Sequence, residues 1–233
     1  MALARVKGMV SVVVPVHNRK RYVVECLESL RTQTYRNIEI IIVDDASTDG
    51  ATQVVRGWVK KNSGAGQAKV RLVLLSRNVG YAGALTTGMY LARGEFIAIQ
   101  DADDYSHRER MRRQAEFLQS RKSVGMVGSS YSLVRSGKVL QQGPGWLRYG
   151  WNNIKRAYKA GGHCVSLGTV MFRGQIFDRL GGLRRRLEGA EDYDFIANCI
   201  KHGVLVENLR APLYYYRLHR SQRSRLYYPR SIS

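Results

Sequence analysis

An apolar run passes directly into a cluster of acids in the stretch Glu95-Phe96-Ile97-Ala98-Ile99-Gln100-Asp101-Ala102-Asp103-Asp104. The apolar part has the composition of a buried strand, so the three carboxylates are expected where that strand ends. Carboxylates crowded at such a position repel one another and lose hydration, which is costly unless a cation lies among them. Mg2+ and Mn2+ bind carboxylate oxygens, often together with the phosphates of a substrate. The stretch therefore predicts a site for a divalent metal and a diphosphate.

The chain is poor in acids, with 38 Lys and Arg against 18 Asp and Glu and a formal net charge of +20. Half of its acids nevertheless gather in three short clusters, which argues against a role as solvated surface. Asp is common in turns and at helix N-caps, and this simpler role is favoured for Asp49 and Asp194. A functional role is favoured for Asp45, Asp103 and Asp192. The clusters are Asp44, Asp45 and Asp49; Asp101, Asp103 and Asp104; and Glu191, Asp192 and Asp194.

Length and composition narrow the class of protein. At 233 residues, the chain suits one large domain or two small ones and can bury a substantial core. The excess of positive charge implies anionic partners, which include nucleic acid, anionic lipid and phosphorylated substrates. Three widely spaced cysteines without a CxxC pair favour reduced thiols in a cytosolic protein, without a disulfide framework or a zinc site. No apolar run approaches the roughly 20 residues that span a bilayer.

Strands and helices are expected to alternate along the first half of the chain. Continuous apolar runs predict buried strands, and apolar residues at helical spacing or runs of small residues predict the helices between them. This alternation predicts a parallel, doubly wound sheet, in which ligands bind at the carboxyl ends of the strands. The acids at 44–45 and 101–104 follow two of these strands. The predicted strands are 10–16, 38–43, 70–75 and 95–100, and the predicted helices are 20–33, 51–61 and 81–93.

The chain beyond the second helical segment also contains less regular parts, which are predicted by composition. A flexible turn at Ser63-Gly64-Ala65-Gly66 ends the second helical segment, and a basic tail rich in Arg and Tyr runs from Asn208 to Ser233. Between them we expect a helix over 107–120, a strand over 124–134, a Gly- and aromatic-rich loop over 143–163, a strand over 167–172 and a helix over 190–202.

The motifs of the chain, in their order and spacing, resemble those of family 2 glycosyltransferases over roughly residues 9–219. They are Val13-Val14-Pro15-Val16-His17-Asn18-Arg19, Ser29-Leu30-x-x-Gln33-Thr34-Tyr35, Glu39-Ile40-Ile41-Ile42-Val43-Asp44-Asp45-Ala46-Ser47-Thr48-Asp49, Arg77-Asn78-Val79-Gly80, Ala92-Arg93-Gly94-Glu95-Phe96-Ile97, Asp101-Ala102-Asp103-Asp104, Gly168-Thr169-Val170-Met171-Phe172-Arg173, Gly181-Gly182 and Gly189-Ala190-Glu191-Asp192-Tyr193-Asp194.

The resemblance implies a fold and a division of the chain. The expected fold is an α/β GT-A fold, with a single Rossmann-like, mostly parallel central sheet flanked by helices and a smaller acceptor-side subregion. Residues 1–104 would form the nucleotide-sugar-binding half, and residues 105–219 the acceptor-binding and catalytic half of the same domain. Residues 220–233 would form a basic tail.

The resemblance also implies the donor site. Asp45 would accept a hydrogen bond from the imide N–H of a uracil-like base, in a pocket lined chiefly by the backbone of Pro15, Val16 and His17. Asp103 would contact the metal, with Asp101 nearer the ribose or sugar and available as a second ligand. Asp104 would orient either one or cap the next helix. The remaining expected donor-binding residues are Asn18, Arg19, Arg77, Asn78, Gly80 and Gln100.

For three residues, a second interpretation beside the role in the donor site remains open. Arg77 would neutralise the diphosphate, although Arg at the end of a strand is often a surface residue. His219, in Tyr215-Tyr216-Arg217-Leu218-His219, would complete the metal shell or bind the diphosphate, and the alternative is an exposed His in a basic tail. His17, like His163, is expected to be structural or to stack on a base.

Asp192 is the implied general base of the reaction. In an inverting transfer, one carboxylate takes the proton from the acceptor hydroxyl as that oxygen attacks the anomeric carbon. Glu191 is the supporting candidate, and the alternative for both is capping of a helix N-terminus by acids.

The expected activity is that of a hexosyltransferase-like enzyme that moves one sugar from a nucleotide diphosphate sugar, with UDP favoured over dTDP, assisted by Mn2+ or Mg2+. The metal would act as a Lewis acid on the departing nucleoside diphosphate. The acceptor would be a glycan or a lipid-linked molecule. The chain lacks the Gln-x-x-Arg-Trp motif and the transmembrane helices of the family's processive synthases. It is therefore expected to add one sugar at a time.

Two other functions remain open at this point. The net charge and the Arg/Tyr tail suit a nucleic-acid-binding protein, although acids at strand ends would repel phosphate in the absence of metal. The second function is that of a scaffold that binds a nucleotide sugar without catalysing transfer. We also expect the tail to bind an anionic membrane surface or a pyrophosphate-linked lipid acceptor, against the alternative of a solvated terminus. The expected location is the cytoplasm, with peripheral contact at the inner face of the membrane.

Overall fold

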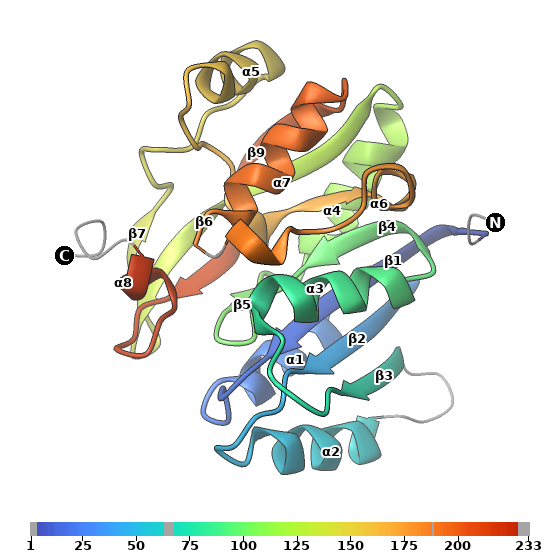
Figure 1. Cartoon of the computed structure of the whole chain (residues 1–233), viewed down its shortest axis with the longest axis vertical. Helices are drawn as coiled ribbons and strands as arrows, with labels where there is room; N and C mark the ends of the chain where they lie inside the picture. The colour runs from blue at the N-terminus through green and yellow to red at the C-terminus, as the bar shows by residue number, and fades with distance from the viewer. Residues whose placement is uncertain (1–3, 63–67, 188, 228–233) are drawn as a thin grey trace.

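The computed structural model describes residues 4–62, 68–187 and 189–227, and the turn predicted at Ser63–Gly66 lies outside them. Within the described residues, a nine-stranded sheet runs through the whole molecule in the order β3-β2-β1-β4-β8-β6-β9-β5, and β7 pairs with β6 (Figure 1). None of the helices in this part of the chain has the length and apolar composition of a membrane span.

The first half of the sheet is parallel, as the alternation of strands and helices predicts. β1 (Val6–Val16) pairs with β2 (Ile38–Asp44) and β4 (Gly94–Ile99), and β2 pairs with β3 (Lys69–Leu74). Every residue of β2 is buried, which explains its continuous apolar sequence. The connecting helices are α1 (Val23–Arg31), α2 (Ala51–Asn62) and α3 (Gly80–Leu91).

The second half of the sheet is mixed. β8 (Met171–Arg173) runs antiparallel between β4 and β6 (Val124–Arg135), and β6 is parallel to β9 (Leu205–Arg217). The short β5 (Tyr105–Ser106) pairs with β9, and β7 (Lys138–Gln142) is the partner of β6. The helices here are α4 (Arg110–Ser120), α5 (Trp151–Lys159), α6 (Gly174–Leu180), α7 (Glu191–Lys201) and α8 (Ser224–Tyr227).

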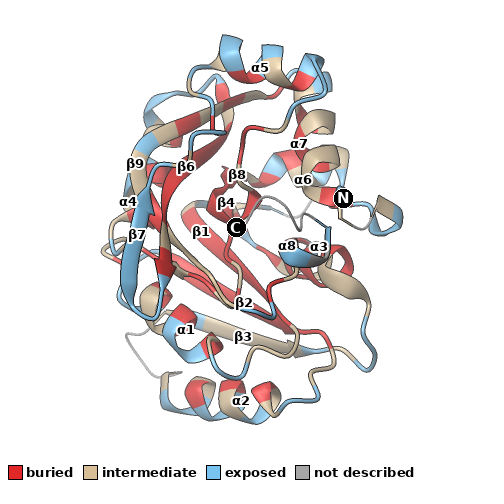
Figure 2. Ribbon diagram, turned by 90° about the vertical axis from the view of Figure 1, so that its left-hand side faces the viewer, coloured by how far each residue is buried: buried red, intermediate tan, exposed pale blue. Residues whose placement is uncertain are grey.

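Helices cover both faces of the sheet, and the buried strands lie between them (Figure 2). Val12 of β1 packs in an apolar cluster with α1, α2 and α4, whereas its neighbour Val13 packs in a second cluster with α3, α5, α6 and α7. This alternation follows from the two-residue period of a strand. The predicted α/β fold with a central sheet flanked by helices is therefore confirmed.

Three predictions for the second half are wrong in part. The loop expected over 143–163 contains α5, which buries Ile154 and Tyr158 four residues apart on one face. The strand expected over 167–172 is a 3-10 turn at Leu167–Thr169 followed by β8. The tail expected from Asn208 begins, up to Arg217, as part of β9, where pairing with β6 and β5 fixes its tyrosines and buries Tyr214.

Candidate active site

A cavity of about 520 Å3 lies at the carboxyl ends of β1, β2 and β4. Its wall is completed by the turn before β8, the first turn of α7 and part of the C-terminal segment at 221–227. Residues from all three acid clusters line it, although they are far apart in the sequence. These are Asp45; Asp101, Asp103 and Asp104; and Glu191 and Asp192.

Loops after β1 and β2 form one end of the cavity. Val16 lies opposite Asp44 in the parallel pair, so the chain leaves both strands side by side. His17 Nδ1 lies 2.7 Å from the Asp45 carbonyl oxygen, which ties the two loops together. Asn18 adds a second link, because its side-chain oxygen accepts hydrogen bonds from the backbone N–H groups of Thr48 and Asp49 at 2.8 and 3.2 Å. Asn18 therefore shapes this end of the cavity.

Asp45 is buried, and its backbone N–H donates to the Val16 carbonyl. Its Oδ1 accepts a 2.7 Å hydrogen bond from the backbone N–H of Val79. Pro15, Asn78 and Gly80 line the same region, and the Asn78 amide lies 3.1 Å from His17 Nε2. The residues predicted for the base pocket thus lie together.

Asp101 lies where β4 ends, held by two tyrosines. Tyr81 donates a 2.9 Å hydrogen bond to Oδ1, and the backbone N–H of Asp101 donates to the Tyr214 hydroxyl at 3.3 Å. Burial, followed by the charge of Asp103, raises the pKa of Asp101 to about 6. Gly168 faces this carboxylate so closely that a Cβ there would lie 2.5 Å from Oδ2. Only glycine therefore fits beside Asp101 without a shift.

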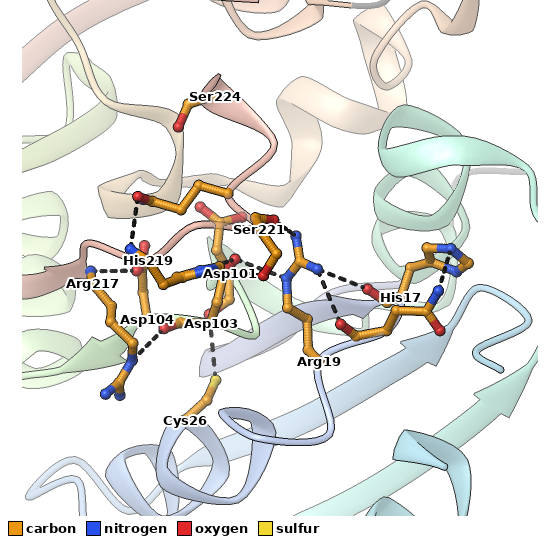
Figure 3. Close-up of polar contacts among 12 residues, drawn as sticks. His17, Arg19, Cys26, Asp101, Asp103, Asp104, Arg217, His219, Ser221 and Ser224 are labelled. Atoms are coloured by element: carbon orange, nitrogen blue, oxygen red, sulfur yellow. Dashed lines mark hydrogen bonds and ion pairs between the residues drawn. The ribbon is translucent and has the colours of Figure 1, made fainter. Parts of the chain in front are cut away.

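Asp103 is the most strongly paired acid of the cluster (Figure 3). Its Oδ2 lies 2.8 Å from Arg19 Nε and 3.1 Å from His219 Nε2. Burial acts to raise the pKa of Asp103, but the hydrogen bond from His219 and the charge of Arg19 outweigh it and hold the pKa below its usual value. His219, predicted to complete the metal shell or bind the diphosphate, is not the exposed residue of the alternative, because its side chain is 7% exposed. Its ring packs on the Tyr22 ring with centroids 4.5 Å apart.

Asp104 faces away from this pair toward β9. It is buried, and its Oδ1 accepts a 2.8 Å hydrogen bond from the backbone N–H of Arg217. Burial and the charges of Asp103 and Asp101 raise its pKa well above the usual range. The carboxylates of the Asp101–Asp104 run therefore oppose one another's ionisation, and burial adds to this cost.

A divalent cation among these carboxylates would offset that cost, so they fit the predicted metal. No group of three His, Cys, Asp or Glu side chains that could hold a metal ion occurs in the described part of the chain. One or two carboxylates together with the phosphates of a ligand are a common way to hold Mg2+. Asp101 and Asp103 suit that arrangement better than a metal cage made of protein alone.

The first turn of α7 brings the third acid cluster to the cavity. Glu191 is buried, and its Oε1 lies 2.5 Å from Nη2 of Arg223. Asp192 is about a third exposed, with Oδ1 accepting a 2.7 Å hydrogen bond from the backbone N–H of Tyr193 and Oδ2 lying 3.4 Å from His163 Nε2. Burial acts to raise the pKa of Asp192, but His163 holds it below its usual value. A partly exposed, ionised carboxylate at a cavity wall is suited to accept a proton.

Asp49 and Asp194 were expected to lie in turns or at helix N-caps, and the structure bears this out for Asp49. Asp49 Oδ1 accepts a 2.9 Å hydrogen bond from the Ala51 N–H at the start of α2. Asp194 instead forms an ion pair with Arg184, so an ion pair replaces the expected cap.

The tail predicted at 220–233 needs a correction for its described residues. Gln222 is buried, Arg223 forms the ion pair with Glu191, and Ser221, Ser224 and Tyr227 line the cavity. These residues cannot be a freely solvated tail, because they form a wall of the site. Residues 228–233 lie outside the described part of the chain.

Two predicted donor-binding residues do not line the cavity. Arg77 is exposed, in agreement with the alternative of a surface residue. Gln100 is fully buried behind the acids, where its Oε1 accepts hydrogen bonds from Ser106 Oγ at 2.6 Å and Arg110 Nη1 at 3.1 Å. An apolar strand followed by a polar residue signals the end of the strand, but not the side to which that residue points.

Other residues of the site were either unnoticed in the sequence, as were Tyr81 and Arg223, or expected only to be structural or to stack on a base, as was His163. Tyr81 and Arg223 line the cavity, and His163 contacts Asp192 through a loop without a recognisable motif. Arg110 is fully buried behind the acid run, where its Nη2 donates a 2.8 Å hydrogen bond to the Ile99 carbonyl. Arg110 and Gln114, four residues apart, both lie on the buried face of α4, which nothing in this arginine-rich segment indicates.

Comparison with known proteins identifies the class. The model of the family described as "Glycosyl transferase family 2" matches residues 11–181, and the chain belongs to this family. EpsE of Bacillus subtilis, provisionally named a glycosyltransferase, is 30% identical over 212 residues, covering 88% of this chain and 71% of that protein. Glycosyltransferase GlyG of Streptococcus pneumoniae is 34% identical over 124 residues, covering 53% of this chain and 40% of that protein.

Solved structures share the fold. TarS 1–349 of S. aureus, in complex with UDP-GlcNAc, matches 92% of this chain with a TM-score of 0.75 and 23% identity. The mannosyltransferase PcManGT of Pyrobaculum calidifontis, in complex with GDP-Man and Mn2+, matches 91% with a TM-score of 0.69 and 24% identity. The chain spans 60% and 57% of those two chains. At this identity, the similarity shows the GT-A fold.

Proposed function

We propose that this protein transfers one sugar from a nucleoside diphosphate sugar, a UDP-sugar, to a hydroxyl group of a glycan or lipid-linked acceptor, with inversion at the anomeric carbon. One observation carries the proposal: Asp45, Asp103 and Asp192 meet in a single cavity at the carboxyl end of the sheet. Family membership and the complex of TarS with UDP-GlcNAc support the choice of donor.

The donor would lie along the cavity from Asp45 toward Asp192. Oδ1 of Asp45 is engaged by the Val79 N–H, so Oδ2 is the oxygen available for the imide N–H of uracil. Arg19 and His219 contact the Asp103 carboxylate, and their N–H groups suit the negative charge of a diphosphate. Asp101 is then left for the ribose or the sugar.

Asp103 and Asp101 would hold Mn2+ or Mg2+ together with the donor phosphates, and the cation would neutralise the charge of the departing nucleoside diphosphate. The complex of PcManGT with GDP-Man and Mn2+ supports this assignment. We assign His219 the role of holding Asp103, because its Nε2 lies against the carboxylate and its Nδ1 lies 3.0 Å from Ser221 Oγ.

Asp192 would act as the general base. The acceptor hydroxyl gives its proton to the Asp192 carboxylate as its oxygen forms a bond to the anomeric carbon. The bond between that carbon and the diphosphate oxygen breaks, and its electron pair leaves with the nucleoside diphosphate. Proton transfer of this kind contributes about 10²–10⁴-fold to the rate. Glu191 is buried in its ion pair, so it supports the turn that carries Asp192.

The donor proposal is tested by thermal shift with UDP, UDP-GlcNAc and GDP-mannose, each with and without Mn2+. At ligand concentrations about 100-fold above Kd, we expect stabilisation of about 3 kcal/mol. In a chain of this size that corresponds to a rise in Tm of about 5–10 °C. The rise should require Mn2+ and be lost in Asp103→Asn. Asp178→Asn is the matched control, because Asp178 forms a comparable ion pair with Arg5 away from the cavity.

Two results would point elsewhere. A shift with single-stranded RNA but with no nucleotide would favour nucleic-acid binding and end the enzyme proposal. Binding of a nucleotide sugar without any release of nucleoside diphosphate, in the presence of candidate acceptors, would favour a scaffold. In the enzyme, Asp192→Asn should bind the donor normally and lose turnover.

The division of the chain and the membrane contact remain proposals. One sheet runs through residues 1–104 and 105–219, which suits two halves of one domain. Arg220 and Arg225 are exposed and are available to an anionic bilayer. Co-sedimentation with vesicles containing about 30% phosphatidylserine should fall when both are changed to Gln, and unchanged binding would contradict the proposal.

A further inference from the structure

We propose that His163 is a positioning residue that fixes the Asp192 carboxylate by donating Nε2–H to it, while Tyr158 and Trp146 hold the imidazole ring in place. The inference rests on the proposed function, because it takes Asp192 as the base. His163 lies in the loop after α5, and Asp192 lies in the first turn of α7. The contact therefore joins two segments that are far apart in the sequence.

Contacts on several sides fix the His163 ring. Its Nδ1 lies 2.9 Å from the Tyr158 hydroxyl, and its Nε2 lies 3.4 Å from Asp192 Oδ2. The Trp146 ring stacks on it with centroids 5.4 Å apart and an interplanar angle of 20°. Tyr193 meets it edge-on at 6.0 Å, and Tyr158 stacks in turn on Tyr193 at 5.3 Å. The ring therefore has little freedom to turn away from Asp192.

The polar partners decide which nitrogen carries the proton. An ionised carboxylate can only accept a hydrogen bond, so Nε2 must carry hydrogen when it faces Asp192. Nδ1 is then free in the neutral ring to accept the Tyr158 O–H. Burial raises the pKa of Tyr158, which keeps this hydroxyl protonated. The two contacts thus select the Nε2–H tautomer, as a hydrogen bond at one ring nitrogen commonly does for the other.

The 3.4 Å separation is long for a hydrogen bond. Catalytic hydrogen bonds are often long in the absence of ligands and shorten when the reacting groups are in place. Oδ1 of Asp192 is already held by the Tyr193 N–H, so the His163 contact at Oδ2 fixes the second oxygen of the same carboxylate. A carboxylate held at both oxygens presents a constant face to the acceptor hydroxyl.

His163 does not take the proton in this scheme. The acceptor proton goes to Asp192, and the Nε2–H bond persists throughout, so no second transfer is needed. The titratable groups that face Asp192 and His163 are Tyr158 on α5, Tyr193 on α7 and Tyr81 on α3. Burial raises the pKa of Tyr81 and Tyr158, so neither hydroxyl ionises near neutral pH.

The tautomer is tested on the full chain without ligands, by NMR of 15N-labelled histidine across a pH series. The chain has five His, and His163→Gln assigns the relevant signals. We expect the Nε2–H tautomer for neutral His163. The Nε2 signal should shift in Asp192→Asn, because the carboxylate that accepts its hydrogen bond is lost. The Nδ1–H tautomer, or an Nε2 signal unchanged in Asp192→Asn, would overturn the proposal.

Two variants that differ by one methylene separate positioning from packing. The amide nitrogen of Gln can occupy the place of Nε2, whereas the shorter Asn reaches only the place of Nδ1. With UDP-GlcNAc and Mn2+, we expect UDP release by His163→Gln to stay within about threefold of the parent. In His163→Asn, kcat should fall about 10- to 100-fold with unchanged donor Kd. The acid limb of its pH profile should move to higher pH, because the base loses its stabilising donor.

The outcomes also separate this inference from the proposed function. His202→Gln, on an exposed histidine at the end of α7, is the matched control and should behave like the parent. Equal losses in His163→Gln and His163→Asn, with Asp192→Asn inactive, would sink the positioning role alone. Full turnover in Asp192→Asn would instead remove Asp192 as the base.

Discussion

Arg223 Nη2 lies 2.5 Å from Glu191 Oε1, so a residue of the C-terminal segment pairs with the first turn of α7. The Glu191 side chain is 2% exposed, and neither of its carboxylate oxygens has a hydrogen bond within the described part of the chain. The charge of Arg223 is therefore the main compensation for this buried acid. Its guanidinium also lies over the rings of Tyr81 and Tyr227, at 5.1 and 4.9 Å from their centroids.

Removing Arg223 should lower the free energy of unfolding more than removing Glu191. Arg223→Gln leaves an uncompensated carboxylate in the interior, which costs about 2–4 kcal/mol after allowance for the partial exposure of Arg223. Glu191→Gln leaves an arginine that is 32% exposed and can regain water, so we expect about half that loss. Urea unfolding of both variants measures the difference.

Arg225→Gln is the control for the Arg223 prediction. Arg225 lies two residues further along the same segment and is exposed, so its loss should cost less than about 0.5 kcal/mol. If Arg223→Gln proved no more destabilising than Arg225→Gln, the C-terminal segment would not be held by Glu191.

The first half of the fold could be predicted because three of its four strands, β1, β2 and β4, are mostly buried, whereas the edge strand β3 is only partly buried. A run such as Ile40-Ile41-Ile42-Val43 is unambiguous, and parallel strands place their ends at one edge of the sheet. The second half could not be predicted in the same way. β8 has three residues and is antiparallel to both neighbours, and its pairing with β4 is invisible to any local pattern.

The site shows the same limit. Asp45, Asp103 and Asp192 were predicted because each lies in a short motif. Arg223 was missed, and the contact of His163 with Asp192 was not predicted, because their partners lie in other segments and only folding brings them together. Arg77 and Gln100 were misplaced because a motif fixes where a residue lies along the chain, while burial decides where its side chain points.

Gly168→Ala should damage the site through a single methyl group. A Cβ at this position would lie 2.5 Å from Asp101 Oδ2 and 2.8 Å from the Tyr214 hydroxyl, so one of these groups must move. We expect a loss of stability of about 1–3 kcal/mol, typical of overpacking. Donor binding in the presence of Mn2+ should weaken at least tenfold.

Gly145→Ala is the matched control, because a Cβ at Gly145 has nothing within 4 Å. Calorimetric titration with UDP and Mn2+ compares the two variants with the parent. Equal affinities for Gly168→Ala and Gly145→Ala would show that Asp101 does not need this close approach.

The raised pKa of Asp101 predicts a dependence of stability on pH in metal-free buffer. Its pKa is about 6 in the folded chain and 3.8 as the ordinary value, so the folded state binds the extra proton between these limits. Stability should therefore fall as pH rises from about 4 to about 6, by at most about 3 kcal/mol from this group. Asp101→Asn removes that penalty.

The difference between Asp101→Asn and the parent isolates this effect from other titrating groups. We expect the two free energies of unfolding to converge near pH 4 and the variant to be the more stable at pH 7. Addition of EDTA keeps cations out of both samples. A difference that stays constant from pH 4 to pH 7 would mean that Asp101 ionises normally in the fold.

His219 could either hold the Asp103 carboxylate or bind the metal directly, and its contacts favour the first role. Both of its ring nitrogens are engaged, with Nε2 3.1 Å from Asp103 Oδ2 and Nδ1 3.0 Å from Ser221 Oγ. A nitrogen that donates to a carboxylate has no lone pair for a metal, so we expect His219 to hold Asp103 and not the cation. His219→Gln can keep an N–H near the same place, whereas His219→Ala removes it. The Mn2+-dependent thermal shift with UDP should therefore survive in His219→Gln and shrink, without vanishing, in His219→Ala. Complete loss of the shift in both variants, with Asp103→Asn no worse, would make His219 a direct ligand of the metal.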